Sequence, residues 1–400
     1  MKNNSFGLYI HMPFCVRKCS YCDFLSFSAD DDVKTSYTEA LLREIEVRAS
    51  LYRDRTITSV FIGGGTPTAM PASCLRKVMA AVRRSFTLCP EAEITVEMNP
   101  GTDHPSLEAF LTEDVNRISL GLQSFDDSEL AALGRIHTAE MSRDTYDHLR
   151  RLGIDNINID LMAALPHQTR RSFEHTLRAA AALRPEHISV YSLIIEEGTP
   201  FARLYREGEP PLPDEETERE MDALTERILS EAGYHRYEIS NYARDGRECR
   251  HNRLYWECRD YLGIGLGAAS LMDGCRFSVT ESLDDYLTLT ELTGSEGRLL
   301  SAEKEIWDKL LMTGRERLSR YDRMAEFMFL GLRLTEGITE AEFRERFDTD
   351  LDDIYGAVIR RHIRSGLMRR TPGGYALTGR GRDISNTVMA DFIIDNDEER

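Results

Sequence analysis

Short apolar runs alternate with amphipathic stretches through the first half of the chain. The runs at residues 7–12, 59–62, 93–97, 117–122, 157–160 and 187–193 have the length of strands. Between the first two, Tyr37, Leu41 and Ile45 repeat every four positions, which predicts a helix over residues 34–54. Strands and helices that alternate with crossovers this long indicate a parallel sheet. Six such units predict an α/β fold, an incomplete (β/α)6 barrel that gathers ligand-binding residues at the carboxyl ends of its strands.

A different pattern fills residues 322–392. One helix is predicted at 324–334, a second begins at a capping box formed by Thr339 and Glu342, and a third is predicted at 351–365. A hairpin turn is predicted at Pro372-Gly373-Gly374. Three helices and a hairpin resemble a small winged-helix-like α+β domain. The sequence therefore predicts three parts, which are a barrel domain at 1–245, a helical connector at 246–320 and a C-terminal domain at 321–400. Another strand is predicted at 237–242, at the end of the first part.

Charge and composition narrow the function. Lysine and arginine number 50 against 68 aspartate and glutamate, so the net charge of −18 disfavours a broad grip on nucleic acid. The C-terminal domain has a local basic patch that comprises Arg360, Arg361, Arg364, Arg369 and Arg370. This patch keeps a nucleic-acid-linked role as a remote alternative, and a solvated helix face is the simpler interpretation. No apolar run reaches the length of a membrane span, and the first residues lack the apolar core of a signal peptide, so we expect a cytoplasmic protein without a transmembrane segment.

Three of the eight cysteines form one short cluster. Cys15, Cys19 and Cys22 have C-x3-C-x2-C spacing, and the others are scattered, which fits metal chemistry in a reducing compartment better than a disulfide framework. A structural zinc site needs a fourth ligand, and the nearest cysteines, Cys74 and Cys89, have no matching paired spacing. A [4Fe-4S] cluster held by three thiolates instead leaves one iron open to a small molecule. The residues alone keep both the zinc site and the iron-sulfur cluster as alternatives.

Polar residues end several of the predicted strands. Glu97 ends the third strand, Gln123 the fourth and Asp160 the fifth, where each is either a ligand contact or a polar residue satisfied at a loop. The second strand runs into the glycines at 63–65, and glycine lets backbone amides approach a ligand closely. Both features place a candidate ligand site at the carboxyl edge of the sheet.

These motifs carry a family resemblance that covers nearly the whole chain. The chain is similar to the radical S-adenosylmethionine (SAM) proteins, in the branch that contains oxygen-independent coproporphyrinogen III oxidase and the heme chaperones. The matching stretches are Tyr9-Ile10-His11-Met12-Pro13-Phe14 before the cysteines, Gly63-Gly64-Gly65-Thr66-Pro67, Glu97-Met98-Asn99-Pro100, Gly121-Leu122-Gln123-Ser124-Phe125, Asn158-Ile159-Asp160-Leu161 and His251-Asn252-Arg253-Leu254-Tyr255-Trp256.

The resemblance implies a [4Fe-4S] cluster on the three cysteines and a bound SAM. Arg135 matches an arginine that meets the SAM carboxylate, a pairing that suits a planar guanidinium. The other SAM residues that it implies are Gly64, Gly65 and Thr66 for the amino group, Glu97 for the methionyl part, Gln123 and Asp160 for the ribose side, and Tyr9 and Tyr21 as aromatic residues that flank the cluster and cofactor.

A histidine beside aromatic residues, as at His251, Tyr255 and Trp256, is more often structural than a ligand. The resemblance changes that interpretation, because the His-Asn-x-x-Tyr-Trp motif looks like one associated with heme. It implies that His251 is an axial heme ligand and that the two aromatic residues offer flat surface to the porphyrin.

Two features distinguish the members of this branch. Phe24 stands where the oxidases have a further cysteine, and only fourteen residues precede Cys15. Both favour a heme chaperone of porphyrin metabolism, whose partners are heme and a heme-accepting protein, and they leave a homodimer open. The alternative is an enzyme, a radical SAM oxidative decarboxylase of coproporphyrinogen III, so the resemblance leaves open whether the chain is a catalyst. One loop departs from the family, because Ala164 and His167 replace two glycines, and His167 is expected at the surface.

Overall fold

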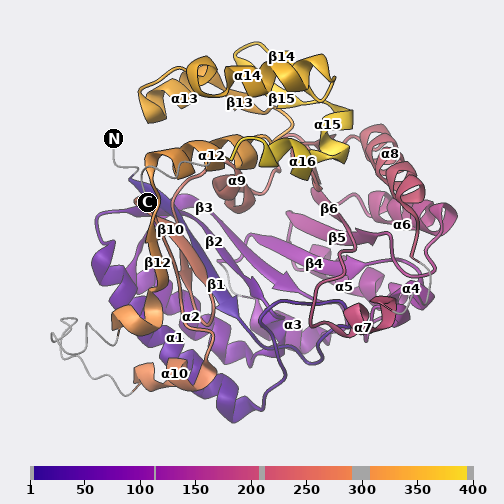
Figure 1. The fold of residues 1–400 in the computed structure, drawn as a ribbon. Coiled ribbons are helices and arrows are strands. Elements are labelled where there is room, and N and C mark those ends of the chain that lie inside the picture. Colours follow the sequence, from indigo (N-terminus) through magenta and orange to yellow (C-terminus); the bar gives the residue numbers. More distant parts are fainter. Residues whose placement is uncertain (1–3, 112–113, 207–211, 291–306, 394–400) are drawn as a thin grey trace.

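A computed structural model describes residues 4–111, 114–206, 212–290 and 307–393. In that part of the chain twelve strands form one sheet, in the order β12-β11-β10-β9-β1-β2-β3-β4-β5-β6-β8-β7 (Figure 1). Six consecutive parallel strands form its centre: β1 (Ser5–Met12), β2 (Thr56–Gly64), β3 (Thr87–Met98), β4 (Arg117–Gln123), β5 (Ile157–Ala163) and β6 (His187–Ser192). All six predicted strands are present, and the sheet curves without closing, so the predicted incomplete barrel is confirmed.

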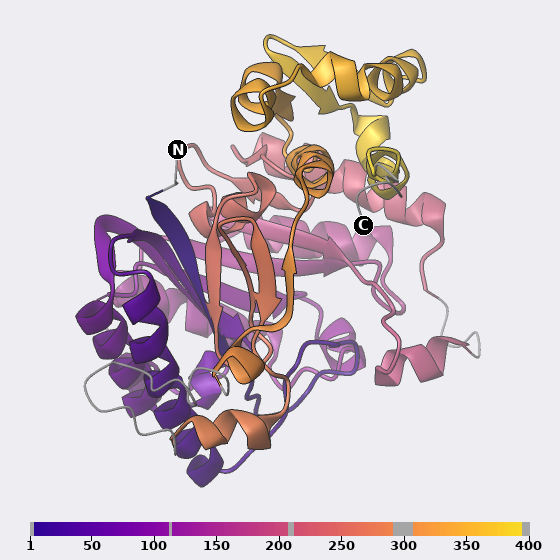
Figure 2. The same ribbon diagram turned by 60° about the vertical axis from the view of Figure 1, so that its left-hand side comes forward.

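Helices follow these strands, and the longer ones cover the outer face of the sheet, whereas α7 lies against the cysteine loop (Figures 1 and 2). They are α1 (Asp31–Leu51), α2 (Ala72–Ser85), α3 (His104–Phe110), α4 (Asp127–Ala132), α5 (Ala139–Arg151), α6 (Arg170–Ala182), α7 (Pro200–Arg206) and α8 (Glu215–Glu231), with the short 3-10 turn η1 (Pro67–Ala69) after β2. In α1 the apolar residues predicted to face the core, Tyr37, Leu41 and Ile45, are fully buried. The helix begins after Asp30, whose carboxylate accepts from the Val33 amide, and it ends before the predicted residue 54 because residues 52–55 form the turn into β2.

The segment at 246–320, predicted as a helical connector, extends the first sheet instead. It contains α9 (Arg250–Trp256), β9 (Tyr261–Ile264), β10 (Ala269–Met272), β11 (Cys275–Ser278), α10 (Leu283–Leu287), η2 (Thr288–Thr290) and β12 (Thr313–Arg317). β9 pairs in parallel with β1 and buries Leu262 and Ile264 completely, so these short apolar runs complete the other side of β1 (Figure 2). The predicted boundary at 245/246 therefore does not coincide with a break in the sheet.

The predicted strand at 237–242 is only partly present. β7 (His235–Arg236) and β8 (Asn241–Ala243) are antiparallel, and residues 237–240 form the turn between them. The Tyr237 amide donates to the Asn241 carbonyl oxygen, and the Ser240 amide donates to the Glu238 carboxylate, which closes this turn. β8 then pairs with β6, and β7 forms the far edge of the sheet.

The C-terminal residues form a second core above the sheet (Figure 1). Its elements are α12 (Arg320–Gly331), β13 (Ile338–Thr339), α13 (Glu340–Phe347), α14 (Leu351–Arg364), β14 (Met368–Thr371), β15 (Gly374–Leu377), α15 (Gly379–Asp383) and α16 (Ser385–Ala390). The three helices and the hairpin match the prediction, and Thr339 caps α13 by accepting from the Glu342 amide. In the predicted basic patch, Arg360 pairs with Asp352 and Arg361 pairs with Asp391. None of the helices in the described ranges has the length and apolar character that a membrane span needs.

Candidate functional site at the mouth of the sheet

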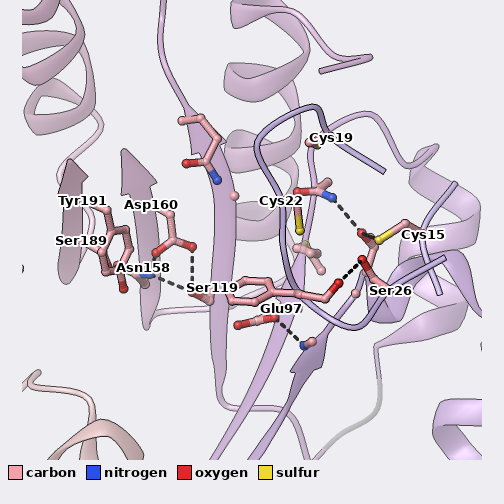
Figure 3. A pocket seen from close by; sticks show the side chains of 18 of the residues that line it. Cys15, Cys19, Cys22, Ser26, Glu97, Ser119, Asn158, Asp160, Ser189 and Tyr191 are labelled. Carbon is pink, nitrogen blue, oxygen red and sulfur yellow. Dashed lines mark hydrogen bonds between the residues drawn. The ribbon is translucent and has the colours of Figure 1, made fainter. Parts of the chain in front are cut away.

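A pocket of about 490 Å³ opens at the carboxyl ends of the central strands. Figure 3 shows the three thiols on one side of it and Asn158, Asp160, Ser189 and Tyr191 on the other, with Glu97 and Ser119 between them. The structure brings together nearly all the predicted site residues, because fourteen of them line this pocket: Tyr9, Cys15, Cys19, Tyr21, Cys22, Gly64, Gly65, Thr66, Glu97, Gln123, Arg135, Asp160, His251 and Tyr255. Trp256 is the predicted site residue that does not line it.

The cysteine loop is fixed at both ends by backbone hydrogen bonds. Phe14 is fully buried and packs edge-on against Phe27 and Tyr37, and the Cys15 amide donates to the Phe27 carbonyl oxygen at 3.0 Å. Further along, the Ser20 amide donates to Leu133, and Ser20 accepts from the first turn of α7. The loop therefore crosses the pocket mouth in one held conformation, with its thiols in the pocket wall.

The three thiols fit an iron-sulfur cluster better than a single metal ion. Cys15, Cys19 and Cys22 are all free and partly exposed in the same pocket. Within the described ranges, no three His, Cys, Asp or Glu side chains converge as the ligands of one ion would. Ligands of a four-iron cluster bind different irons and are spread around it, so three separated thiols on one wall suit that group. When bound, such a cluster supplies one-electron chemistry and an open iron site.

A chain of side-chain hydrogen bonds joins the cysteine loop to Arg135. The Thr66 hydroxyl lies 3.5 Å from the Cys15 Sγ, and it accepts from the Asn99 Nδ2 at 2.8 Å. Arg135 Nη1 donates to the Asn99 Oδ1 at 2.7 Å, whereas its Nε is buried and has no partner. Arg135 is thus held with part of its guanidinium unpaired beside the thiols, as a carboxylate-binding arginine would be.

The glycine run packs against both the cysteine loop and Glu97. The Gly65 and Thr66 amides donate to the carbonyl oxygens of Met12 and Phe14, and a Cβ on Gly65 would lie 2.7 Å from those same two oxygens. A Cβ on Gly63 would lie 2.5 Å from the Glu97 carboxylate. Side chains are therefore excluded here by close contact with the elements that carry the candidate ligands.

Replacing Gly65 with alanine is expected to displace the cysteine loop, because backbone oxygens cannot yield as the end of a flexible side chain can. We expect a fall in the thermal unfolding midpoint and a lower iron content after cluster reconstitution. Gly373→Ala is the matched control, because a Cβ there meets nothing within 4 Å. Equal iron content in the two variants would contradict the close contact.

Glu97 carries the carboxylate most affected by the site. Its Oε2 accepts from the Gly64 amide at 2.9 Å, and burial raises its pKa to about 7, with a smaller contribution from Asp160. A carboxyl with this pKa changes charge near neutral pH. In its ionised form it suits a ligand ammonium group.

Gln123 lies where the prediction placed it, and Asp160 does not. Gln123 is the last residue of β4, at a bulge, with φ of 71°, a backbone conformation that side chains other than glycine rarely adopt. Asp160 lies in the middle of β5, so the prediction that it ends the strand is wrong. It accepts from Ser119 at 3.1 Å and from Asn158 at 2.7 Å, and burial raises its pKa. Its side chain therefore belongs to a deeper layer of the pocket than Gln123.

The two predicted aromatic residues lie beside and within the cysteine loop. The Tyr9 hydroxyl donates to Nδ1 of His11, whose Nε2 donates to the Leu25 carbonyl oxygen, so β1 is tied to the end of the loop. Tyr21 is on the loop itself and packs against Phe201 of α7. Burial raises the pKa of both tyrosines, which keeps them neutral.

The heme-type motif forms α9, and its residues have different environments. His251 is 1% exposed; its Nδ1 lies 2.8 Å from the Ser59 hydroxyl and its Nε2 lies 2.9 Å from the Tyr255 hydroxyl. Burial lowers the pKa of this imidazole to about 3, so it is neutral. Trp256 faces away from the pocket, where the Arg333 guanidinium lies over its ring at 4.3 Å. The motif thus connects the pocket floor with the C-terminal domain.

The loop at 164–169 keeps the backbone form that glycine favours. Ala164 has φ of 59° and His167 has φ of 62°, both in the left-handed region. Gln168 is buried and holds the loop through Glu129 and the Met162 carbonyl oxygen. His167 is exposed, as predicted.

The prediction missed a set of pocket residues. Asn99 and Asn252 lie inside the stretches that match the family, so those motifs could have identified them. Arg117 lies outside these stretches, and nothing in the local sequence marked it as a pocket residue. The lining residues that it did not select as site residues include Asn99, Arg117, Ser119, Asn158, Ser189, Tyr191 and Asn252.

The fold and the cysteine loop define a radical SAM protein. The sequence pattern of the Radical SAM superfamily matches residues 9–180, and that of the HemN C-terminal domain matches residues 318–384. A solved structure of coproporphyrinogen III oxidase (HemN) from Escherichia coli superimposes with a TM-score of 0.82 at 24% identity, over 98% of this chain and 90% of that one. This structural likeness shows the fold.

Full-length relatives define the family more narrowly. The protein named heme chaperone HemW of Bacillus subtilis is 33% identical over 387 residues, which cover 96% of this chain and 98% of that protein. Heme chaperone HemW of Escherichia coli is 32% identical over 394 residues, at 97% and 98% coverage. This chain belongs to the HemW family of the radical SAM superfamily, and that membership implies a [4Fe-4S] cluster and SAM.

Proposed function

We propose that the protein is a heme chaperone, which binds heme and passes it to an acceptor protein. The observation that carries this proposal is family membership over nearly the full length, because the relatives named for this function align from end to end. The acceptor, a homodimeric assembly and a cytoplasmic location remain predictions. Phe24, 63% exposed at the pocket mouth, supports the chaperone over the oxidase, in which the family resemblance implies a further cysteine.

In this proposal Cys15, Cys19 and Cys22 hold the cluster, and the surrounding residues bind and orient SAM. Arg135 would pair with the SAM carboxylate, and ionised Glu97 would accept from the N–H groups of its amino nitrogen. Gly64, Gly65 and Thr66 would border the amino group, Gln123 and Asp160 the ribose side, and Tyr9 and Tyr21 the cluster and cofactor. Their common pocket supports these roles.

His251 remains the predicted axial heme ligand, and its contacts set a condition on that role. Both ring nitrogens are engaged, so iron would have to displace either Ser59 or Tyr255. Tyr255 would then be freed beside the ring, where it lines the pocket. The predicted aromatic contact from Trp256 would require a heme that reaches beyond the pocket.

Replacing His251 with alanine is expected to destabilise the fold by about 2–4 kcal/mol, because it leaves a buried gap and two unpaired hydroxyls. Chemical denaturation of the apo protein measures this change. His251→Gln is the milder variant, because an amide can still hydrogen bond to Ser59 or Tyr255. A loss of heme binding in both variants, with stability kept in His251→Gln, would support iron ligation.

The function is tested by an anaerobic assay of the cluster-reconstituted protein. Heme or coproporphyrinogen III is supplied with SAM and a reductant, and heme absorbance and porphyrin product are followed in parallel. We expect tight heme binding, transfer to an apo-hemoprotein and no decarboxylated product. Product formation that disappears in Cys19→Ser would instead make the protein a coproporphyrinogen III oxidase.

A further inference from the structure

One buried arginine in the pocket has no hydrogen-bond or ion-pair partner among the residues that the structure describes. Arg117 is the first residue of β4 and is 1% exposed, and it lines the pocket with Ser119 and Gln123 of the same strand. In the described part of the chain, no carboxylate lies within ion-pair distance of its guanidinium and no acceptor is hydrogen bonded to it; its Nε is completely buried. Nearby acids keep the guanidinium charged, but a buried hydrogen-bond donor without an acceptor is costly, so a ligand is the expected reason for retaining it.

The acidic groups that face Arg117 are already engaged. The Glu93 carboxylate accepts from the amides of Arg250 and His251 and from the Cys249 thiol. The Asp160 carboxylate accepts from Ser119 and Asn158 (Figure 3). Both acids balance the charge of Arg117 at a distance, and neither offers it the two parallel hydrogen bonds that a guanidinium makes with a carboxylate.

The remaining groups around Arg117 cannot replace an anion. His187 and His251 are buried, and burial, with the nearby guanidinium, lowers the pKa of both, so each stays a neutral imidazole. His187 is also hydrogen bonded on both sides, to Asn158 and to Tyr237. The polar side chains beside Arg117 are therefore already hydrogen bonded within the protein. The guanidinium of Arg117 is the group that can still bind a ligand.

The position of Arg117 separates this site from the one predicted for SAM. Arg117 and Gln123 are six residues apart on β4, which is about 20 Å along a strand. The SAM carboxylate is predicted at Arg135, beyond the carboxyl end of that strand. Arg117 would therefore meet a second acidic group, on the floor of the pocket.

We propose that the pocket floor is a carboxylate-binding site, in which the Arg117 guanidinium pairs with an acidic group of the ligand. The inference rests on the proposed function, because heme carries two propionate carboxylates and one of them would be the acidic group that pairs with Arg117. A short free carboxylate is the other source of the same chemistry. Asn158, which pairs with Ser119 in the sheet, and Ser189, which donates to Asn158, supply the neutral polar surface nearest to it.

The test uses the full-length, cluster-reconstituted protein with SAM, and compares wild type with Arg117→Met. One titration uses heme and heme dimethyl ester, and the other uses propionate. We expect Arg117→Met to weaken heme binding about 10- to 100-fold and esterification to weaken it similarly in wild type. The ester should bind the variant and wild type equally. SAM affinity should not change.

Thermal stability separates a ligand role from a structural one. Arg117→Met should lower the unfolding midpoint of the apo protein less than the control does, because it breaks no direct hydrogen bond or ion pair and removes only the charge that balances Glu93 and Asp160 at a distance. Arg150→Met is the matched control, since Arg150 pairs with Glu186 and Tyr146 and its loss should lower the midpoint. A fall in Arg117→Met as large as in the control, with heme and ester affected equally, would overturn the proposal.

The two titrations distinguish the sources of the carboxylate. Heme binding that depends on both Arg117 and free propionates assigns the site to a tetrapyrrole. If wild type binds no heme, the proposed function fails, but Arg117-dependent binding of propionate would still support the floor site. If Arg117→Met changes neither heme nor propionate binding, the proposal is wrong and the heme chaperone function is untouched.

Discussion

Replacing Cys19 with serine is expected to abolish the iron-sulfur absorbance of the reconstituted protein and, with it, the tight binding of SAM. The three thiols of the loop provide no spare ligand, and serine is a poor substitute for a thiolate on iron. The open iron that would bind the SAM amino and carboxyl groups is then lost. Iron content, visible absorbance and calorimetric titration with SAM measure the two effects.

The control for this experiment is a cysteine away from the loop. Cys89 is partly exposed on β3 and does not line the pocket, so Cys89→Ser should keep both the cluster and SAM binding. The fold should survive in either variant, because the strands have their own core. A Cys19→Ser protein that retains a full complement of iron would show that the cluster does not depend on this thiol.

The sequence predicted best where a single local pattern decides the structure. The six central strands follow from apolar runs, and the buried face of α1 follows from its four-residue repeat. The cysteine loop was likewise readable from spacing alone. In contrast, β9 to β12 are short strands that extend the sheet beside β1. The pairing of β9 with β1 joins residues about 250 positions apart. Local patterns carry no information on such a partner.

The pocket residues show the same limit. Asp160 was recognised as a site residue but placed at a strand end, because a run of apolar residues does not reveal where a strand stops. Arg117 was overlooked, because an arginine at the start of a strand normally faces solvent. Arg117 is notable because its buried guanidinium has no direct acceptor among the described residues. This can be recognised only in the structure, once the neighbouring acids have been located.

Glu97 and Arg117 share a physical property that connects stability with ligand binding. Burial disfavours the charge of Glu97, whereas Arg117 keeps its charge through distant acids but has no direct hydrogen-bond acceptor in the described part of the chain. Each therefore keeps binding capacity for a ligand of opposite charge that the free protein does not use. Replacing them with neutral side chains should therefore separate the two properties, and the direction of the change can be predicted for each.

Replacing Glu97 with glutamine is expected to stabilise the apo protein at pH 8 and to weaken SAM binding about 10- to 100-fold. The pKa of Glu97 is about 7 in the folded protein and 4.5 ordinarily, so between these values the folded state holds a proton that the unfolded state has lost. Stability therefore falls as the pH rises from 4.5 to 7, by about 3 kcal/mol in total, and Glu97→Gln should remove this decline. Urea unfolding at pH 4.5, 6 and 8 measures it.

SAM affinity should rise with pH, whereas the stability of the apo protein falls. In wild type SAM affinity should rise between pH 6 and 8 as Glu97 ionises, and the Glu97→Gln protein should lose that part of the rise. Glu129 provides the control, because it is a buried acid outside the pocket that accepts from Ser124, Gln168 and Ser172. Glu129→Gln should lower stability and leave SAM affinity unchanged. If Glu97→Gln destabilises the protein as Glu129→Gln does, then Glu97 is a structural acid, and the SAM amino group must find its hydrogen-bond acceptor elsewhere.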